Sequence, residues 1–418
     1  MTETTPQATF ANLGLIPTLI ERLDVLEYHQ PTPIQSHVIP HILNGRDIVG
    51  GANTGSGKTA AFALPILQKV MQEEAQPLRG NFVSHLILVP TRELASQVAY
   101  SVKSYSYHVR EKVKTTALFG GVSVNPQMLA LRGGSDIVVA TPGRLLDLVS
   151  SNALKLDHVK TLVLDEADRM LSLGFTDELN KILALLPQKK QTLLFSATFP
   201  EKVTSLAQNL LHNPIEIQLQ SADASTLVQR VFSVNKGQKT AVLAHLIQQH
   251  QWRQTLIFVN AKNACNHLAQ KLSKRGITAE VFHGDQGQGA RTRVLDAFKS
   301  GEIQVLIATD IAARGLDIEK LPVVINFDLP RSPADYMHRI GRSGRAGEIG
   351  LGLSLIDYDD YHHFKVIEKK NKFQLEREQV EGFEVEDDQN EAYFLPMTPR
   401  AKPAGTGKKK KKRKQDNG

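Results

Sequence analysis

The segment DIVG at Asp47–Gly50, followed by ANTGSGKT at Ala52–Thr59, decides the fold of the first half of the chain. A short apolar run, a glycine-rich turn and the helical sequence TAAFALPILQKVM follow one another here. Backbone N–H groups in such a strand-to-helix turn surround a polyphosphate at the start of the helix. Lys58 is placed to reach the phosphates and the Thr59 hydroxyl to bind Mg²⁺. The strict pattern has glycine where this chain has Ala52, and the alternative is a glycine-rich turn with an incidental lysine.

Similar apolar runs recur along the chain between helical stretches. In the first half they are Asp47–Gly50, Leu86–Val89, Thr115–Phe119, Ile137–Ala140, Thr161–Leu164 and Thr192–Phe195. In the second half they are Val231–Val234, Leu256–Val259, Ala279–Phe282, Val305–Ala308, Val323–Phe327 and Leu351–Leu355. Near-continuous apolar strands that alternate with helices indicate parallel sheets covered on both faces. The two series predict an α/β chain with two doubly wound parallel-sheet domains in tandem.

Composition excludes several classes of protein. The chain has 418 residues, of which 41% are hydrophobic and 22% charged, which argues against a small stapled scaffold and a mostly disordered chain. Its one cysteine, Cys265, excludes an internal disulfide and a cysteine-based zinc site. The N-terminus does not resemble a secretory signal, and no run approaches the roughly 18 apolar residues of a membrane span. We expect a soluble cytoplasmic protein without a membrane partner.

Charge and polarity suggest where the domains end. The polar stretch QSADAST lies within the expected linker, and the strand signals stop after residue 372. Glu376–Glu391 then has eight acids against one arginine, and residues 401–418 have eight Lys/Arg against one acid. We expect this basic end to be disordered. The expected units are an N-terminal segment 1–36, a first domain 37–217, a linker 218–227, a second domain 228–372, and an acidic segment with a basic tail at 373–418.

Two adjacent acids follow the apolar run Thr161–Leu164. Asp165 and Glu166 therefore lie at the carboxyl end of an expected strand, where α/β sheets bind ligands. Asp165 is suited to hold Mg²⁺ through water, and Glu166 to orient and deprotonate an attacking water. The alternative is a solvated acidic loop, which the lysine-containing loop upstream makes less favoured.

At these residues the chain resembles a known family. Asp165 to Asp168 spell DEAD, and the chain is similar to the DEAD-box ATP-dependent RNA helicases of superfamily 2 from about Phe10 to Lys372. The motifs come in the family's order: PTRELA at Pro90–Ala95, GG at Gly120–Gly121, TPGR at Thr141–Arg144, SAT at Ser196–Thr198, LIFVN at Leu256–Asn260, QxxR at Gln288–Arg291, ATDIAARGLDI at Ala308–Ile318 and HRIGRSGR at His338–Arg345. The compact body and short basic tail are similar to the bacterial RhlE-like group. The resemblance implies two RecA-like domains.

The resemblance also implies roles in nucleotide binding and hydrolysis. Gln35 in PTPIQ matches the adenine-recognition motif, and Phe10 matches an aromatic that stacks on the base; a core anchor is the alternative for Phe10. The family usually has glycine where this chain has Glu27, so the backbone there needs examination. Implied nucleotide contacts are Phe10, Gln35, Ala52, Asn53, Thr54, Gly55, Ser56, Gly57, Lys58, Thr59 and the ribose contact Asp317. Implied catalytic residues are Glu166, Lys58, Asp165 and the arginine fingers Arg342 and Arg345, with Thr59 and Asp165 at the metal.

Further roles concern coupling and RNA. Ser196 and Thr198 would link phosphate state to domain closure, with Asp168 as their partner, and His338 belongs to the same interface between the domains as Asp317. The RNA contacts implied by the family are Thr91, Arg92, Gly121, Thr141, Gly143, Arg144, Arg291 and Thr309. Such contacts read the backbone and the 2′-OH, not base identity.

The sequence therefore predicts an ATP- and Mg²⁺-dependent RNA helicase that closes two domains on one RNA strand. The alternatives are an RNA-stimulated ATPase clamp with little unwinding and a DNA translocase of the same superfamily. We expect a monomer whose partners are RNA and proteins of ribosome assembly or RNA decay.

Overall fold

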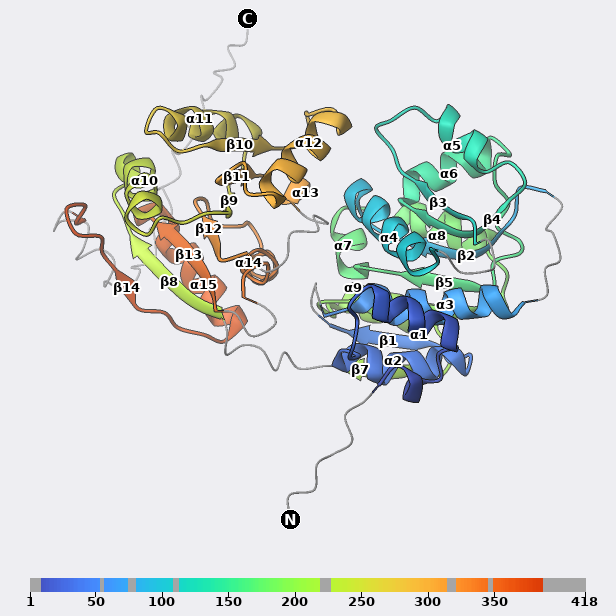
Figure 1. Ribbon diagram of the computed structural model, residues 1–418. Helices are drawn as coiled ribbons and strands as arrows, with labels where there is room; N and C mark the ends of the chain where they lie inside the picture. Colours follow the sequence, from blue (N-terminus) through green and yellow to red (C-terminus); the bar gives the residue numbers. More distant parts are fainter. Residues whose placement is uncertain are drawn as a thin grey trace, which may run out of the picture.

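The computed structural model describes residues 9–52, 56–73, 80–107, 113–218, 227–313, 321–344 and 349–385. These residues form two α/β domains, each built on a seven-stranded sheet (Figure 1). The basic end at 401–418 and most of the expected linker lie outside the described residues.

The first sheet has the strand order β3-β4-β2-β5-β6-β1-β7. Its strands are β1 Ile48–Gly51, β2 Val83–Leu88, β3 Thr115–Leu118, β4 Ser135–Ala140, β5 Thr161–Leu164, β6 Gln191–Ser196 and β7 Ile215–Gln218. Its helices are η1 Ala11–Leu13, α1 Pro17–Val25, α2 Pro33–Leu43, α3 Lys58–Gln72, α4 Arg92–Tyr105, α5 Asn125–Ala130, α6 Pro142–Ser150, α7 Ala167–Ser172, α8 Thr176–Leu185 and α9 Glu201–Leu210.

The second sheet has the corresponding order β10-β11-β9-β12-β13-β8-β14. Its strands are β8 Leu227–Ser233, β9 Thr255–Phe258, β10 Ala279–Phe282, β11 Val305–Ala308, β12 Val323–Asn326, β13 Gly350–Ile356 and β14 Arg377–Glu378. Its helices are η2 Lys236–Gln238, α10 Lys239–Gln249, α11 Lys262–Ser273, α12 Gln288–Lys299, α13 Asp310–Ala313, α14 Pro333–Ile340, η3 Tyr358–Asp360 and α15 Tyr361–Asn371.

Every strand pairing within the described residues is parallel. The central strands are buried on both faces, which explains their continuous apolar sequences. Successive side chains point to opposite faces of a strand, so Val163 enters one core while Leu162 and Leu164 enter the other. This arrangement confirms the predicted tandem of doubly wound parallel-sheet domains.

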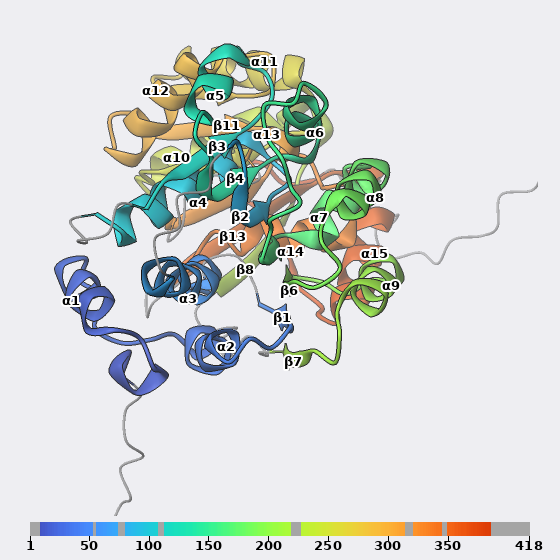
Figure 2. The same cartoon turned by 90° about the vertical axis from the view of Figure 1, so that its right-hand side faces the viewer.

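The helices cover both faces of each sheet. In the first domain α1 to α4 pack on one core, and α6 to α9 pack on the other; Figure 2 shows the two groups on either side of the strands. In the second domain α10 and α11 cover one face, while α12 to α15 cover the opposite face. Trp252, the single tryptophan of the chain, packs against the core under α10 and stacks on His250 with ring centroids 5.0 Å apart.

One close approach in the first sheet requires glycine. Gly50 on β1 is paired with Phe195 on β6, and a Cβ atom at residue 50 would lie 2.6 Å from the Phe195 ring. The ring therefore packs directly over the backbone of β1, the strand that leads into the glycine-rich turn. A side chain at this position would push β1 away from β6.

The second domain extends beyond residue 372, where the sequence analysis placed its end. β14 pairs with β8, and its Arg377 donates hydrogen bonds of 2.9 and 2.8 Å to Glu368 of α15. Val380 and Val385 are buried in the cores of this domain. The first ten residues of the acidic segment are thus part of the folded domain, and its remainder lies outside the described residues.

The backbone at Glu27 has the left-handed conformation that favours glycine. Its φ is +62°, and it follows the last turn of α1. The Glu27 N–H donates to the Asp24 carbonyl and the Tyr28 N–H to the Leu23 carbonyl, at 3.0 and 2.9 Å. This is the hydrogen-bond pattern of a Schellman helix end, whose left-handed residue is usually glycine.

Replacing Glu27 by glycine should therefore stabilise the protein. We expect Glu27→Gly to raise the free energy of unfolding by about 1 kcal/mol, since an L side chain in this conformation costs about that much. Urea denaturation followed by circular dichroism measures the change. Glu21→Gly, at an exposed position inside α1, is the control and should instead lower stability by about 1 kcal/mol. Equal losses in the two variants would contradict the assignment of strain to Glu27.

Candidate functional site

The glycine-rich turn joins β1 to α3, as the sequence predicts. Helix α3 begins at Lys58, and Gly57 before it has a φ of +91°. The Lys58 ammonium is buried and donates a 2.8 Å hydrogen bond to the Ala52 carbonyl, which closes the turn. Ser56 and Thr59 belong to the described residues on the helix side of the turn, whereas Asn53, Thr54 and Gly55 lie outside them.

Gln35 connects this turn to helix α2. It is the third residue of α2, and its side-chain oxygen accepts a 2.9 Å hydrogen bond from the Thr32 N–H. Its amide nitrogen donates a 3.1 Å hydrogen bond to the Gly57 carbonyl. The Gln35 side chain is 1% exposed. Its two hydrogen bonds use one lone pair and one N–H, so one N–H and one lone pair of the amide remain for a further partner.

Phe10 lies in the first core. Its side chain is 3% exposed and packs in the same cluster as Leu13 and Leu15. The structure thus places this aromatic as an anchor for the N-terminal segment, and its stacking on a base stays a prediction.

Asp165 follows β5 and is fully enclosed. Its Oδ1 accepts a 2.9 Å hydrogen bond from the Glu166 N–H. Burial raises the pKa of the Asp165 carboxyl to about 6, and the nearby Lys58 ammonium acts in the opposite direction without cancelling the effect. The ionised carboxylate is therefore incompletely compensated by the protein alone, and a cation beside it would restore its usual ionisation.

These residues fit a magnesium ion. The Thr59 hydroxyl and the Asp165 carboxylate are hard oxygen ligands of the kind Mg²⁺ prefers. Among the described residues no group of three or more His, Cys, Asp or Glu side chains could hold a metal by itself. An ion here would need further oxygen ligands from phosphate and water, which is the usual manner of Mg²⁺ binding.

Glu166 is held in an unusual conformation at the start of α7. Its φ is +52°, in the left-handed region that is rare for residues other than glycine. Its Oε2 is buried and accepts no hydrogen bond from any described residue, and Arg169 Nε lies 4.0 Å from it. A buried carboxylate oxygen with a free lone pair is suited to accept a hydrogen bond from water.

Asp168 links three segments: the sequence analysis expected its contacts with Ser196 and Thr198, and the structure adds His338. Its Oδ2 accepts hydrogen bonds from the Thr198 N–H at 2.9 Å and the Thr198 hydroxyl at 2.6 Å. Its own N–H donates to the Ser196 hydroxyl at 3.3 Å. His338 of the second domain lies 3.9 Å from the same carboxylate, so this carboxylate contacts both domains. Burial lowers the pKa of His338, and Asp168 opposes that effect.

Of the other predicted nucleotide residues in the second domain, Arg342 follows α14 and is buried. Arg345 and Asp317 lie outside the described residues.

The predicted RNA residues of the first domain lie at the starts of helices and in one loop. Thr91 and Thr141 precede α4 and α6, and Gly143 lies in the first turn of α6. Gly121 has a φ of +77°, and a Cβ there would lie 2.2 Å from the Arg92 guanidinium. The structure thus brings Arg92 against the glycine loop.

Arg144, also in the first turn of α6, reaches that same loop. Its Nη2 donates a 2.9 Å hydrogen bond to the Val122 carbonyl. Its Nε and Nη1 are buried and donate no hydrogen bond to any described residue, although Asp147 lies 3.7 Å from Nε. Unused N–H donors of this kind are available to a phosphate.

Two predicted RNA residues belong to the second domain. Thr309 follows β11 directly before α13, and Arg291 lies in α12. Arg291 is buried, forms a 3.0 Å ion pair with Glu93 of α4 and lies over the Phe282 ring. Burial lowers the pKa of its guanidinium, while Glu93 opposes the shift. This ion pair is a second contact between the domains.

Sequence reasoning did not assign Glu93 or Arg339. Both lie inside quoted motifs, PTRELA and HRIGRSGR, and that was the only available signal. Arg339 is 2% exposed, and its five N–H donors bind Asp310, Asn326, Asn260 and the Asp328 carbonyl. It therefore joins segments that follow three different strands of the second sheet.

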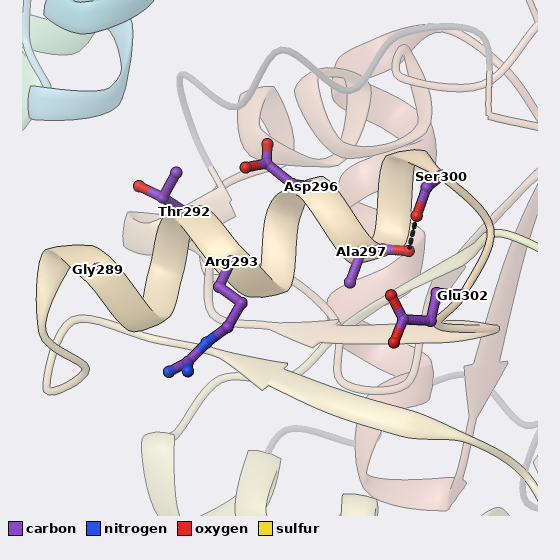
Figure 3. Close-up of a pocket in the computed structure, with 7 residues that line it drawn as sticks. All are labelled: Gly289, Thr292, Arg293, Asp296, Ala297, Ser300 and Glu302. Atoms are coloured by element: carbon purple, nitrogen blue, oxygen red, sulfur yellow. Dashed lines mark hydrogen bonds between the residues drawn. The ribbon is translucent and has the colours of Figure 1, made fainter.

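A pocket of about 660 Å³ lies apart from these residues, on the surface of α12 (Figure 3). Its lining includes Thr292, Arg293, Asp296 and Glu302. Two acids against one arginine do not suit a polyphosphate, so we assign it no part in nucleotide binding. In the described part of the chain, no helix is both long and apolar enough to cross a membrane.

Comparison with known proteins agrees with this geometry. Residues 32–206 match the model of the DEAD/DEAH box helicase family, and residues 238–347 match the helicase conserved C-terminal domain. The chain is 39% identical over 369 residues to the ATP-dependent RNA helicase CshA of Listeria monocytogenes, covering 88% of this chain and 69% of that one. It is 40% identical over 371 residues to the ATP-dependent RNA helicase DeaD of Escherichia coli, covering 88% of this chain and 58% of that one.

Solved structures are similar over most of their length. Saccharomyces cerevisiae Dbp5 bound to RNA and ADP BeF3 has a TM-score of 0.78 and 30% identity, covering 92% of this chain and 97% of that one. A DEAD box protein from the hyperthermophile Methanococcus jannaschii has a TM-score of 0.53 and 36% identity, covering 89% and 99%. With the family models matched in order and the phosphate turn, carboxylates and paired domains in place, the chain belongs to the DEAD/DEAH box helicase family.

Proposed function

We propose that this DEAD-box ATP-dependent RNA helicase hydrolyses ATP, with Mg²⁺, between its two domains and uses their closure to hold one RNA strand. The observation that carries the proposal is the position of Asp168. Its carboxylate binds Thr198 and lies 3.9 Å from His338 of the second domain. The motif that holds the hydrolytic carboxylates is therefore in contact with the other domain.

ATP binding would depend mainly on the first domain. The start of α3 favours the phosphates because its free N–H groups and helix dipole attract anions. Lys58 is already at this helix start and would exchange the Ala52 carbonyl for phosphate oxygens. Gln35 would bind adenine with the N–H and lone pair that its contacts with Thr32 and Gly57 leave over.

Hydrolysis would combine groups from both domains. Glu166 would orient the attacking water and take its proton, because its buried Oε2 accepts no hydrogen bond from any described residue. Arg342 would stabilise charge on the transferring phosphoryl group. Thr59 and Asp165 would hold Mg²⁺, which neutralises phosphate charge when bound. Because Lys58 and Arg342 belong to different domains, turnover requires that the domains close.

RNA would be held through its backbone. The proposed contacts are helix starts, a glycine loop and arginines, all of which suit phosphates and sugars and none of which reads a base edge. We therefore propose a helicase that opens short duplexes with little sequence preference. A cytoplasmic location is part of the proposal and agrees with the one cysteine of the chain, Cys265, being a free thiol.

A strand-displacement assay tests this function. We expect release of a short strand from an RNA duplex that requires ATP, and little release from the matching DNA duplex. RNA-stimulated ATP hydrolysis without displacement would favour a clamp, and equal activity on DNA would favour a translocase.

Glu166→Gln should separate binding from hydrolysis. The amide cannot accept the water proton, so we expect turnover to fall by at least about 100-fold while ATP and RNA still bind. The complex should release RNA slowly because it remains closed. Steady-state ATPase and RNA dissociation rates measure both effects, with the exposed Glu201→Gln as control. Turnover within a few-fold of the unmodified protein would refute the role of Glu166.

Lys58→Ala and Arg342→Ala should differ in kind. Arg342→Ala should leave ATP binding nearly intact and lower turnover by roughly 10³-fold, as for other arginine fingers. Lys58→Ala should weaken nucleotide binding itself, because the lysine contacts the phosphates. Binding of a fluorescent ATP analogue and single-turnover hydrolysis distinguish them. The exposed Arg331→Ala serves as control. Equal losses of nucleotide affinity would contradict the division of roles between the domains.

Gln35→Ala should reduce discrimination between ATP and GTP. The amide can satisfy adenine with one donor and one acceptor, whereas guanine leaves one bond unmade, a difference of about 1–3 kcal/mol. We expect the ratio of kcat/KM values for ATP and GTP to fall by roughly 10-fold. His37→Ala, on the exposed side of α2, should leave the ratio unchanged. An unchanged ratio in Gln35→Ala would place base recognition elsewhere.

A further inference from the structure

The loop Phe119–Ser123 between β3 and α5 carries Gly121, one of the proposed RNA contacts. Neither β3 nor α5 fixes this loop through its own regular hydrogen bonds. Arg92 packs against Gly121, and hydrogen bonds from two side chains outside the loop, Gln127 and Arg144, bind its backbone.

Gln127 of α5 makes three hydrogen bonds to the loop. Its side-chain oxygen accepts from the Phe119 N–H at 3.0 Å. Its amide nitrogen donates to the Phe119 carbonyl at 3.1 Å and to the Ser123 carbonyl at 3.3 Å. The residue is 9% exposed, so these bonds are shielded from water.

Three carbonyls of the loop are bound by described side chains, whereas four of its consecutive N–H groups are not. Gln127 and Arg144 bind the carbonyls of Phe119, Val122 and Ser123. The N–H groups of residues 120–123 donate no hydrogen bond to any described residue. Consecutive N–H groups without internal partners favour an anion such as a phosphate.

We propose that Gln127 is a positioning residue for RNA binding, which holds the Phe119 and Ser123 carbonyls and thereby leaves the N–H groups of residues 120–123 for the RNA backbone. The inference rests on the proposed function, since it takes RNA as the ligand at Gly121. Glutamine suits the task because its amide both donates and accepts. A lysine or arginine could not accept from the Phe119 N–H, and a carboxylate could not donate to the two carbonyls.

Gln127→Met tests the proposal, because methionine has a similar size but makes none of the three hydrogen bonds. We measure ATPase rates of the full chain against the concentration of a single-stranded RNA. The RNA concentration at half-maximal rate should rise by about 10-fold, as expected if one or two hydrogen bonds from the loop N–H groups to the RNA backbone are lost. Turnover at saturating RNA should stay within about two-fold. Leu129→Ala, at a 55% exposed position of the same helix, is the matched control and should change neither value.

Salt dependence gives a second reading. Gln127 is uncharged, so Gln127→Met should lower RNA affinity without changing the slope of log affinity against log salt. Arg144→Ala should lower the RNA affinity and also make the slope shallower, by up to about 0.7 units for one phosphate contact on a single strand. A changed slope in Gln127→Met would overturn the proposal.

The outcomes separate this inference from the proposed function. If the unmodified protein shows no RNA-stimulated hydrolysis, the proposed function fails. If Arg144→Ala raises the half-maximal RNA concentration and Gln127→Met does not, the role of Gln127 is refuted. A loss of turnover at an unchanged half-maximal RNA concentration would show a merely structural role and would also refute it. Should Gln127→Met fail to fold, Gln127→Glu takes its place, because glutamate keeps the bond from the Phe119 N–H. This variant must then raise the half-maximal RNA concentration and leave turnover at saturating RNA within about two-fold.

Discussion

All strands within the described residues run in the same direction in each sheet, and the rest of the structure depends on this constraint. Parallel strands have their carboxyl ends at one edge, so the segments that follow them meet there. The phosphate turn follows β1, the acidic pair follows β5, and Ser196 ends β6. Residues far apart in the chain are therefore brought together by strand direction and not by contacts between the motifs themselves.

The two polar contacts described above between the domains, both among residues that the structure describes, use residues that also have proposed ligands. Arg291 pairs with Glu93 on the RNA side, and His338 lies beside Asp168 on the nucleotide side. A buried ion pair adds little net stability, because desolvation of both charges offsets their attraction. A phosphate that binds Arg291 competes with Glu93 for the same guanidinium, and Glu93 must then reach solvent or another partner, because a buried charge left alone is costly. This is a physical reason why ligands can change how the domains meet.

The sequence predicted the two sheets and the residues around the nucleotide because both rest on local patterns. Twelve of the strands follow from apolar runs, and the phosphate turn follows from its glycines and lysine. β7 and β14 were missed. β14 has two residues in an acidic segment, which carry no strand signal and pair with β8 because its edge is available. The sequence showed that Glu27 stands where the family usually has glycine, but only the structure shows that its φ is positive. Gln127 had no sequence signal at all, because its role depends on the path of the loop before α5, which brings Phe119 and Ser123 within hydrogen-bond distance of its side chain.

The position of Trp252 has a consequence for spectroscopy. It is the single indole of the chain and packs within the second domain against the core under α10. Intrinsic tryptophan emission therefore reports on the second domain alone, while circular dichroism reports on both. A denaturation curve that differs between these two signals would show the domains unfolding separately, and coincident curves would show one cooperative unit. The protein thus contains a built-in optical probe for the thermodynamic coupling of its two halves.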